Sequence, residues 1–212
     1  MEQSPSMKII ARIHTDFPTK FGIPRQSGLV EELQATVVFT PEYRNPDALR
    51  GIEGFSHLWL IWQFSQAVRE DWSPTVRPPR LGGNARVGVF ATRSPFRPNA
   101  IGLSCVRLES VEQSADLGPV LHVRGADLMD GTPIFDIKPY LPYADAHPEA
   151  AGGFAPVETP RLEVDFPQAL LGRLPVEGID GVAAACKTDG GGMAEAACRA
   201  GQQDVHSAPP KV

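Results

Sequence analysis

The sequence predicts an all-β protein built on one small antiparallel β-barrel with long loops. Short apolar or alternating segments are bounded by glycine, proline, asparagine or aspartate, as strands usually are. The 212 residues include 21 prolines and 20 glycines, which favour turns and short elements over long helices. No amphipathic helix recurs between these segments, as a doubly wound parallel sheet would require. A closed or nearly closed antiparallel barrel accounts for all three observations.

Each expected element has its own signal in the sequence. Residues 33–39 alternate between apolar and polar positions, which is typical of a half-buried strand. Residues 57–64, HLWLIWQF, are apolar almost throughout and predict a central strand buried on both faces. Asn45 followed by Pro46 predicts a short helical turn with the asparagine as its cap. The predicted strands are residues 8–14, 33–39, 57–64, 86–91, 103–111, 120–124, 134–137 and 161–166.

Residues 7–167 are expected to form the barrel domain, and residues 168–212 a low-complexity, disordered tail. After about Pro175 the chain is rich in glycine and alanine, and its few large apolar side chains cannot bury much surface. Within the barrel domain, residues 65–84 and 140–160 form long proline-containing loops, and loops of that length are usually functional or disordered.

The sequence indicates a cytoplasmic protein with no membrane span. No run of about 18 apolar residues occurs. The N-terminus lacks the basic region and apolar core of a signal peptide. Cys105, Cys186 and Cys198 are an odd number of cysteines without the spacing of a disulfide framework, which favours a reducing compartment.

Charge is distributed unevenly along this acidic chain. The net charge is −5, yet residues 72–108 contain six arginines and no aspartate, glutamate or lysine. Such a segment creates a local positive field that attracts a polyanion, although a solvated basic face explains the charge equally well. Arginine without lysine favours bidentate recognition of phosphate or carboxylate.

No short motif names a reaction. The five histidines are scattered without metal-ligand spacing, so no metal site is predicted. The chain has neither a P-loop nor a G-x-S-x-G turn. The glycine-rich residues 81–84 precede a predicted strand instead of following one, so the dinucleotide-binding fingerprint is absent.

Four polar clusters lie in loops at the ends of predicted strands, and together they suggest a pocket. In residues 93–99, two prolines restrict the chain, so Arg93, Phe96 and Arg97 have little conformational freedom left to lose on binding. An exposed connector or a plain hairpin turn explains any one cluster taken alone. The other clusters are residues 24–26, 65–66 and 128–133.

Three long stretches resemble the TsaA-like family: RGIEGFSHLWLIW, TVRPPRLGGNARVGVFATRSPFRPNAIG and LMDGTPIFDIKPYLPYAD. The likeness covers about residues 8–166. Characterised bacterial members of that family are tRNA methyltransferases, which use S-adenosylmethionine to methylate the threonylcarbamoyl-modified adenosine beside the anticodon. The resemblance implies a small β-barrel in place of a Rossmann fold. It also implies a homodimer with the cofactor site near the subunit interface.

The family's cofactor contacts fall on the polar clusters and on one strand residue. Either Arg25 or Arg93 suits the carboxylate of the cofactor, because a guanidinium group binds a carboxylate bidentately. Where the family can carry His-Gln, this chain has Ser65-Gln66, which leaves a main-chain contact at residue 65. Carried over position by position, the implied contacts are Pro24, Arg25, Gln26, Ser65, Gln66, Arg93, Leu103, Leu128, Met129, Asp130 and Gly131.

The resemblance also suggests which residues would serve the tRNA. Phe96 is expected to stack on an exposed base, and four arginines are expected to contact phosphates. Asp130 and Asp136 are candidates for the base that removes a proton from the acceptor nitrogen. The four arginines are Arg77, Arg80, Arg86 and Arg97.

The resemblance does not extend along the whole chain. Full-length bacterial members continue into a C-terminal domain with an Asp-Pro-Arg-Pro motif, and the sequence after Pro175 does not match it. We therefore expect that domain to be missing. Two alternatives to the methyltransferase stay open: a cofactor-binding regulatory protein with little or no catalysis, and a non-catalytic RNA-binding barrel.

Overall fold

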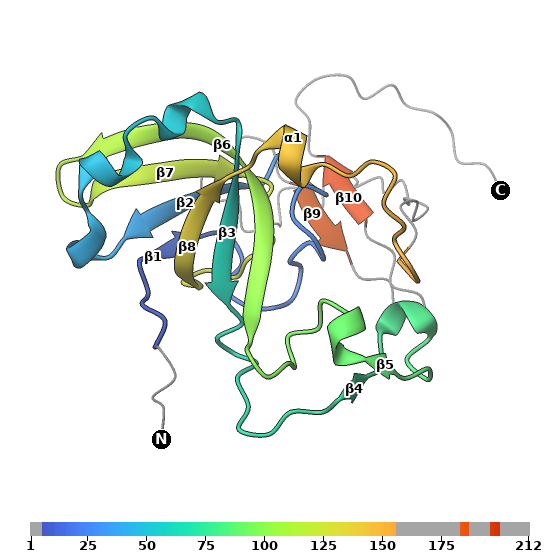
Figure 1. Cartoon of the computed structure of the whole chain (residues 1–212). Coiled ribbons are helices and arrows are strands. Elements are labelled where there is room, and N and C mark those ends of the chain that lie inside the picture. The colour runs from blue at the N-terminus through green and yellow to red at the C-terminus, as the bar shows by residue number, and fades with distance from the viewer. Residues whose placement is uncertain (1–5, 156–182, 187–195, 200–212) are drawn as a thin grey trace, which may run out of the picture.

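The centre of the protein is a closed antiparallel barrel with the strand order β1-β2-β7-β6-β3-β8 (Figure 1). The computed structural model describes residues 6–155, 183–186 and 196–199. The barrel strands are β1 (Ala11–His14), β2 (Gln34–Phe39), β3 (His57–Gln63), β6 (Ile101–Ser114), β7 (Gly118–Arg124) and β8 (Pro133–Pro139). The predicted all-β antiparallel barrel is confirmed, and closure leaves no unpaired sheet edge in it.

The hydrophobic core lies inside the barrel and is built from alternate residues of its strands. Successive side chains of a strand point to opposite faces, so every second residue of β2 and of β3 is buried. The observed burial of β2 thus agrees with the alternation predicted for residues 33–39. The most deeply buried side chains include Ile13, Val37, Leu58, Leu60, Val106, Leu121, Leu128 and Ile134.

The outward face of β3 is only half-buried, so the prediction of burial on both faces is wrong. A strand of a closed barrel has a single inward face, and its other face needs separate cover. Here the ring of Trp59 packs 5.7 Å from that of Tyr140, and its Nε1–H donates to Asp145 Oδ2 at 3.0 Å. Asp145 ends the short helix α1 (Pro142–Asp145).

Between β2 and β3 the chain makes three 3-10 turns, η1 (Pro41–Tyr43), η2 (Pro46–Leu49) and η3 (Ile52–Gly54). The capped turn predicted at Asn45 is confirmed. The Asn45 side chain accepts a hydrogen bond from the Asp47 N–H at 3.0 Å, and Pro46 occupies the first position of η2.

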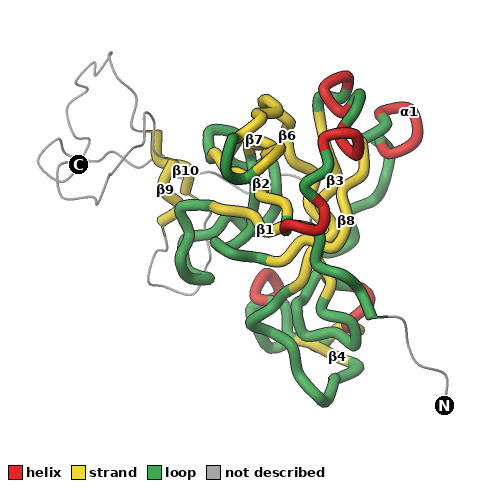
Figure 2. The backbone as a smooth tube through the Cα atoms, turned by 90° about the vertical axis from the view of Figure 1, so that its left-hand side faces the viewer, coloured by secondary structure: helices red, strands yellow, loops and turns green. Residues whose placement is uncertain are grey.

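Residues 65–98 form a long excursion that projects from one end of the barrel (Figures 1 and 2). It contains β4 (Thr75–Val76), η4 (Pro79–Leu81), β5 (Val87–Gly88) and η5 (Val89–Ala91). The strand predicted over residues 86–91 is therefore wrong beyond its first residues. Pairing with β4 ends at Gly88, and Val89 then donates its N–H to Pro74 O as the chain turns into η5.

At the C-terminal side, β9 (Ala183–Cys186) pairs antiparallel with β10 (Ala196–Arg199). The strand predicted at residues 161–166 lies outside the described residues, as does most of the tail predicted at 168–212. Within the part of the chain that the structure describes, no helix has the length and apolar character needed to cross a bilayer.

Candidate functional site

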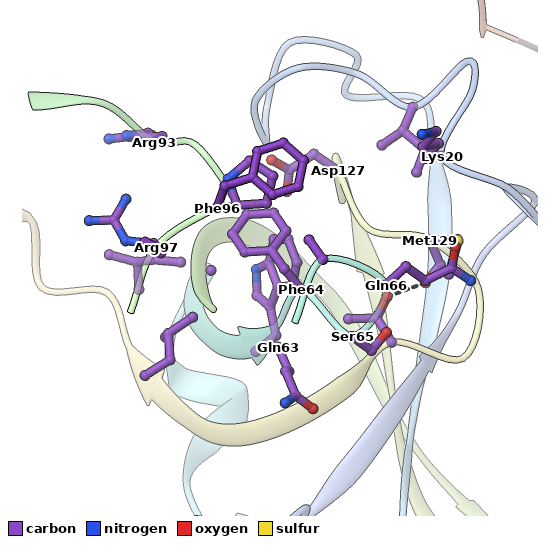
Figure 3. Close-up of a pocket in the computed structure, with 18 of the residues that line it drawn as sticks. Lys20, Gln63, Phe64, Ser65, Gln66, Arg93, Phe96, Arg97, Asp127 and Met129 are labelled. Atoms are coloured by element: carbon purple, nitrogen blue, oxygen red, sulfur yellow. Dashed lines mark hydrogen bonds between the residues drawn. The ribbon is translucent and has the colours of Figure 1, made fainter. Parts of the chain in front are cut away.

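A cavity of about 920 Å³ opens where the excursion meets the barrel (Figure 3). Its volume falls in the range of pockets that hold a small-molecule ligand. All four polar clusters contribute residues to its wall, and the first residues of β6 complete it. Figure 3 shows Arg93 and Arg97 on one side of the cavity, with Lys20 and Met129 on the other side.

The loop of residues 24–26 is tied to two other parts of the wall. Arg93 Nη1 donates a hydrogen bond to Gln26 Oε1, which links this loop to the 92–99 loop. Ser27 Oγ accepts the N–H of Cys105 at 3.1 Å, which fixes the loop to β6. Gln26 Nε2 in turn donates to Arg25 O at 2.5 Å. Arg25 and Arg93 thus reach one cavity from segments distant in the sequence.

The 92–99 loop is held by its own polar side chains as well as by its prolines. Ser94 donates its N–H to Thr92 Oγ1 at 3.2 Å, and Phe96 donates its N–H to Ser94 Oγ at 3.3 Å. Arg97 Nη1 donates to Thr92 O at 2.9 Å. The guanidinium carbon of Arg69 lies 4.0 Å from the Phe96 ring centroid, a cation–π contact. The loop therefore presents its side chains in a fixed arrangement.

The floor of the cavity is formed by Trp62 of β3 and the residues that pack against it. The Trp62 ring lies 4.3 Å from that of Phe64, and Trp62 pairs with Gly102 of β6. A Cβ atom at Gly102 would overlap the indole ring, with Cδ2 only 2.7 Å away. A glycine is therefore required at residue 102 for the ring to lie against the backbone.

A hydrogen-bonded chain leads from this floor to a carboxyl group that faces the cavity. Trp62 Nε1–H donates to Ser104 Oγ at 2.9 Å, and the Ser104 hydroxyl donates to Asp127 Oδ1 at 2.5 Å. Burial raises the pKa of Asp127 above its usual range, while the Ser104 hydroxyl, two main-chain N–H groups and the charge of Arg93 partly oppose this effect.

The cavity combines several cations with this single acid. Among the described residues that line it, Asp127 is the only aspartate or glutamate, and the cations are Lys20, Arg25, Arg93 and Arg97. Side chains of that kind suit a ligand that carries a carboxylate or a phosphate.

The structure places the residues implied for the cofactor in two groups. One group lines the cavity and consists of Pro24, Arg25, Gln26, Ser65, Gln66, Arg93, Leu103 and Met129. The others lie behind the wall or beside it. Leu128 is fully buried in the core, Asp130 Oδ1 bonds to His14 Nδ1 at 3.2 Å, and Gly131 O accepts a hydrogen bond from Arg12.

Neither carboxylate suggested as a base is part of the cavity wall. Asp130 faces His14, and Asp136 on β8 pairs with Lys138 at 2.9 Å. The residues suggested for tRNA also divide. Phe96 and Arg97 line the cavity, whereas Arg77, Arg80 and Arg86 are exposed on the excursion outside it.

The sequence interpretation missed several residues of the wall. Asp127 stands in an otherwise apolar run, residues 126–129, and an isolated acid in such a run is a signal that it faces something polar. Trp62 also lines the cavity, and it gave no such signal because its hydrogen bond to the buried Ser104 joins residues on two strands. Lys20, Gln63 and Asn99 also line the cavity.

The fold and the site define a small β-barrel protein with a ligand-sized cavity, and three arginines, Arg25, Arg93 and Arg97, line that cavity. The chain belongs to the tRNA-methyltransferase O family, because the model of that family's N-terminal domain matches residues 12–146. The tRNA (adenine(37)-N6)-methyltransferase of Escherichia coli is 50% identical over 146 residues, which are 69% of this chain and 62% of that protein.

Two further relatives bear on the site. The crystal structure of TrmO from Pseudomonas aeruginosa superposes with a TM-score of 0.62 at 41% identity and covers 76% of this chain and 67% of that one. A Pyrococcus abyssi protein named "Probable S-adenosyl-L-methionine-binding protein" is 37% identical over 73% of this chain and 78% of its own length. The chain thus spans about 62% of the length of its Escherichia coli relative.

Proposed function

We propose that this protein binds S-adenosylmethionine in the cavity and methylates N6 of an adenosine in tRNA. The observation that carries the proposal is the convergence of Arg25, Arg93 and the apolar wall in one ligand-sized cavity beside an exposed arginine-bearing loop. The name of the Escherichia coli relative supplies the acceptor atom, and that of the Pyrococcus abyssi relative supplies the cofactor. The resemblance described above adds the threonylcarbamoyl group on that adenosine.

The residues of the cavity fit this cofactor. Arg25 and Arg93 suit its carboxylate, since both reach the cavity and a guanidinium binds a carboxylate bidentately. Leu103 and Met129 offer apolar surface for the adenine, and the ring of Phe64 offers a face to a sulfonium cation. When bound, the cofactor supplies an activated methyl group on its sulfur.

The work left to the protein is chiefly positioning. Methyl transfer needs the acceptor nitrogen in line with the methyl group and the sulfur, and orientation of this kind supplies up to about 7–11 kcal/mol in ideal cases. Phe96 is 41% exposed at the cavity wall and is available to stack on the target base. Arg97 lies beside it, and Arg77, Arg80 and Arg86 extend the positive surface toward phosphates.

The same proposal includes the homodimer that the resemblance implies and the cytoplasmic location that the sequence predicts. Ile101 and Leu103, at the start of β6, are 36% and 53% exposed and line the cavity. A second subunit covering these side chains would bury apolar surface and enclose the ligand. Sedimentation at micromolar concentration tests this assembly, and a monomer at every concentration contradicts it.

Calorimetric titration with S-adenosylmethionine tests the binding step. We expect Arg93→Ala to weaken the affinity at least about tenfold, because it removes a charge-assisted hydrogen bond to the ligand. Arg80→Ala is the matched control, since it removes the same charge outside the cavity. Equal losses in the two variants would contradict the assignment of the cavity, and absence of heat with wild-type protein would contradict cofactor binding.

A cofactor-binding protein without catalysis is the second candidate. It is favoured by one observation: neither Asp130 nor Asp136 lines the cavity, so neither candidate base is in place there. Mass spectrometry of tRNA nucleosides from a deletion strain separates the two functions. Loss of the N6-methylated nucleoside, with recovery on complementation, supports the methyltransferase, whereas its persistence at the wild-type level supports the second candidate.

A further inference from the structure

The hydrogen-bonded chain under the cavity has a fixed direction. An indole N–H can only donate, so Ser104 Oγ accepts from Trp62 and is left with its own hydrogen to give away. That hydrogen goes to Asp127 Oδ1 at 2.5 Å. Ser104 is fully buried and Trp62 is 6% exposed, so neither side chain exchanges these bonds for water. These two hydrogen bonds therefore hold the Asp127 carboxyl in one orientation as a hydrogen-bond acceptor.

The proposed reaction requires a group of this kind. An adenosine N6 atom that gains a methyl group has to lose a proton, and a general base has to be within hydrogen-bond reach of that proton. Of the described residues that line the cavity, only Asp127 carries a carboxyl group, and none is a histidine. The charged side chains that share the cavity with Asp127 are Lys20, Arg25, Arg93 and Arg97.

The environment of Asp127 also suits proton transfer. Burial raises the pKa of its carboxyl group, and a base is most effective when its pKa approaches the working pH. The hydroxyl of Ser104 acts in the opposite direction and keeps the ionised form accessible. The two influences come from different elements, because Asp127 follows β7 whereas Ser104 belongs to β6.

We propose that Asp127 accepts the proton that leaves the acceptor nitrogen, and that Ser104 acts as a positioning residue for its carboxylate. In this step the N–H bond breaks and its electron pair stays on nitrogen. The proton forms an O–H bond on the carboxylate, which afterwards releases it to water. The inference rests on the proposed function, since it assigns a role within that reaction.

Asp127→Asn tests the first part of the inference. The amide keeps the shape and still accepts from Ser104, but it cannot take up a proton. We expect kcat to fall by roughly 10²–10⁴-fold, while the calorimetric affinity for S-adenosylmethionine changes less than about threefold. Asp116→Asn is the matched control, an exposed aspartate in the turn between β6 and β7, outside the cavity wall. Its kcat should equal that of the wild type.

Ser104→Ala tests the second part through the pH dependence of kcat/KM, which would not change if Ser104 had a purely structural role. Removal of the hydroxyl takes away a bond that lowers the pKa of Asp127, so this pKa should rise. The acidic limb of kcat/KM should then move to higher pH, and the rate should recover toward the wild-type plateau at high pH. An equal loss of rate at every pH would contradict the positioning role.

A measurement without cofactor or tRNA makes the inference independent of turnover. In carbon-13 NMR of the full chain, one aspartate carboxyl should titrate with a raised pKa, vanish in Asp127→Asn and titrate higher still in Ser104→Ala. An Asp127 carboxyl that titrates in the ordinary range overturns the inference. The inference is also overturned if the wild-type protein methylates tRNA and Asp127→Asn methylates it at the same rate. A wild-type protein that binds cofactor and never methylates overturns the proposed function as well.

Discussion

Asp127 should lower the stability of the folded protein at the pH values where its carboxyl group is ionised and can accept a proton. Burial raises its pKa, so the folded state binds this proton more tightly than the unfolded state does. The contribution of the group to stability is therefore complete below its unfolded pKa and is lost as pH rises through its folded pKa. At pH 8 we expect Asp127→Asn to raise the free energy of unfolding by about 0.5–2 kcal/mol, as substitutions of strained functional groups often do.

Urea unfolding at a series of pH values measures this effect. The difference between Asp127→Asn and wild type should shrink as pH falls through the folded pKa of Asp127, because both proteins then carry a neutral group there. Asp116→Asn should show no such trend, since Asp116 is exposed. A stability difference that is the same at pH 4 and pH 8 would mean that the carboxyl is not desolvated in the folded protein.

At the scale of elements, the contact between β3 and β6 sets the shape of the cavity floor. The Trp62 ring occupies the space where a side chain at Gly102 would stand. We expect Gly102→Ala to cost about 1–3 kcal/mol of folding free energy, as overpacking usually does, and to displace the ring and weaken cofactor binding. Gly88→Ala is the control, because Gly88 also lies in a strand but has no atom near its Cβ position.

Thermal unfolding and calorimetry of the two glycine variants check this prediction. The signal is a lower Tm and a lower affinity in Gly102→Ala, with both quantities close to wild type in Gly88→Ala. A normal Tm and a normal affinity in Gly102→Ala would show that the indole moves aside at no cost.

The same elements show which features the sequence could predict. β2 carries its signal locally, in the two-residue alternation that one buried face imposes, whereas β3 could be predicted from its apolar run although only one of its faces is buried. Residues 86–91 are also rich in valine, yet only β5 forms there because its one partner, β4, is two residues long. The missing partner is a tertiary property that no local pattern contains.

The site likewise combines features that a local sequence pattern indicates with features that depend on tertiary contacts. Stiff polar loops such as residues 93–99 are visible in the sequence, and they do border the cavity. Asp127 has a local signal as an acid in an apolar run, but its orientation depends on Ser104 and Trp62, which lie 23 and 42 residues from their hydrogen-bond partners in the chain. Asp130 stood out as part of a turn motif, and its side chain faces His14 instead of the cavity.

At the scale of the whole molecule, the acidic chain carries its proposed tRNA contacts on one projecting excursion. Arg77, Arg80 and Arg86 are exposed there, outside the cavity, whereas the net charge of the protein is −5. Binding of a polyanion releases counterions, and log K falls with log salt by about 0.7–0.9 for each phosphate neutralised. We therefore expect the triple variant Arg77→Ala, Arg80→Ala, Arg86→Ala to reduce this slope by about two to three.

Fluorescence anisotropy with labelled tRNA at several salt concentrations gives the slope directly. The triple variant should keep the wild-type affinity for S-adenosylmethionine, because none of its three positions lines the cavity. Arg50→Ala is the control for loss of charge, since Arg50 pairs with Asp47 on η2, between β2 and β3. A slope unchanged in the triple variant would place the tRNA on another face of the barrel and leave the arginines of the excursion as a solvated surface.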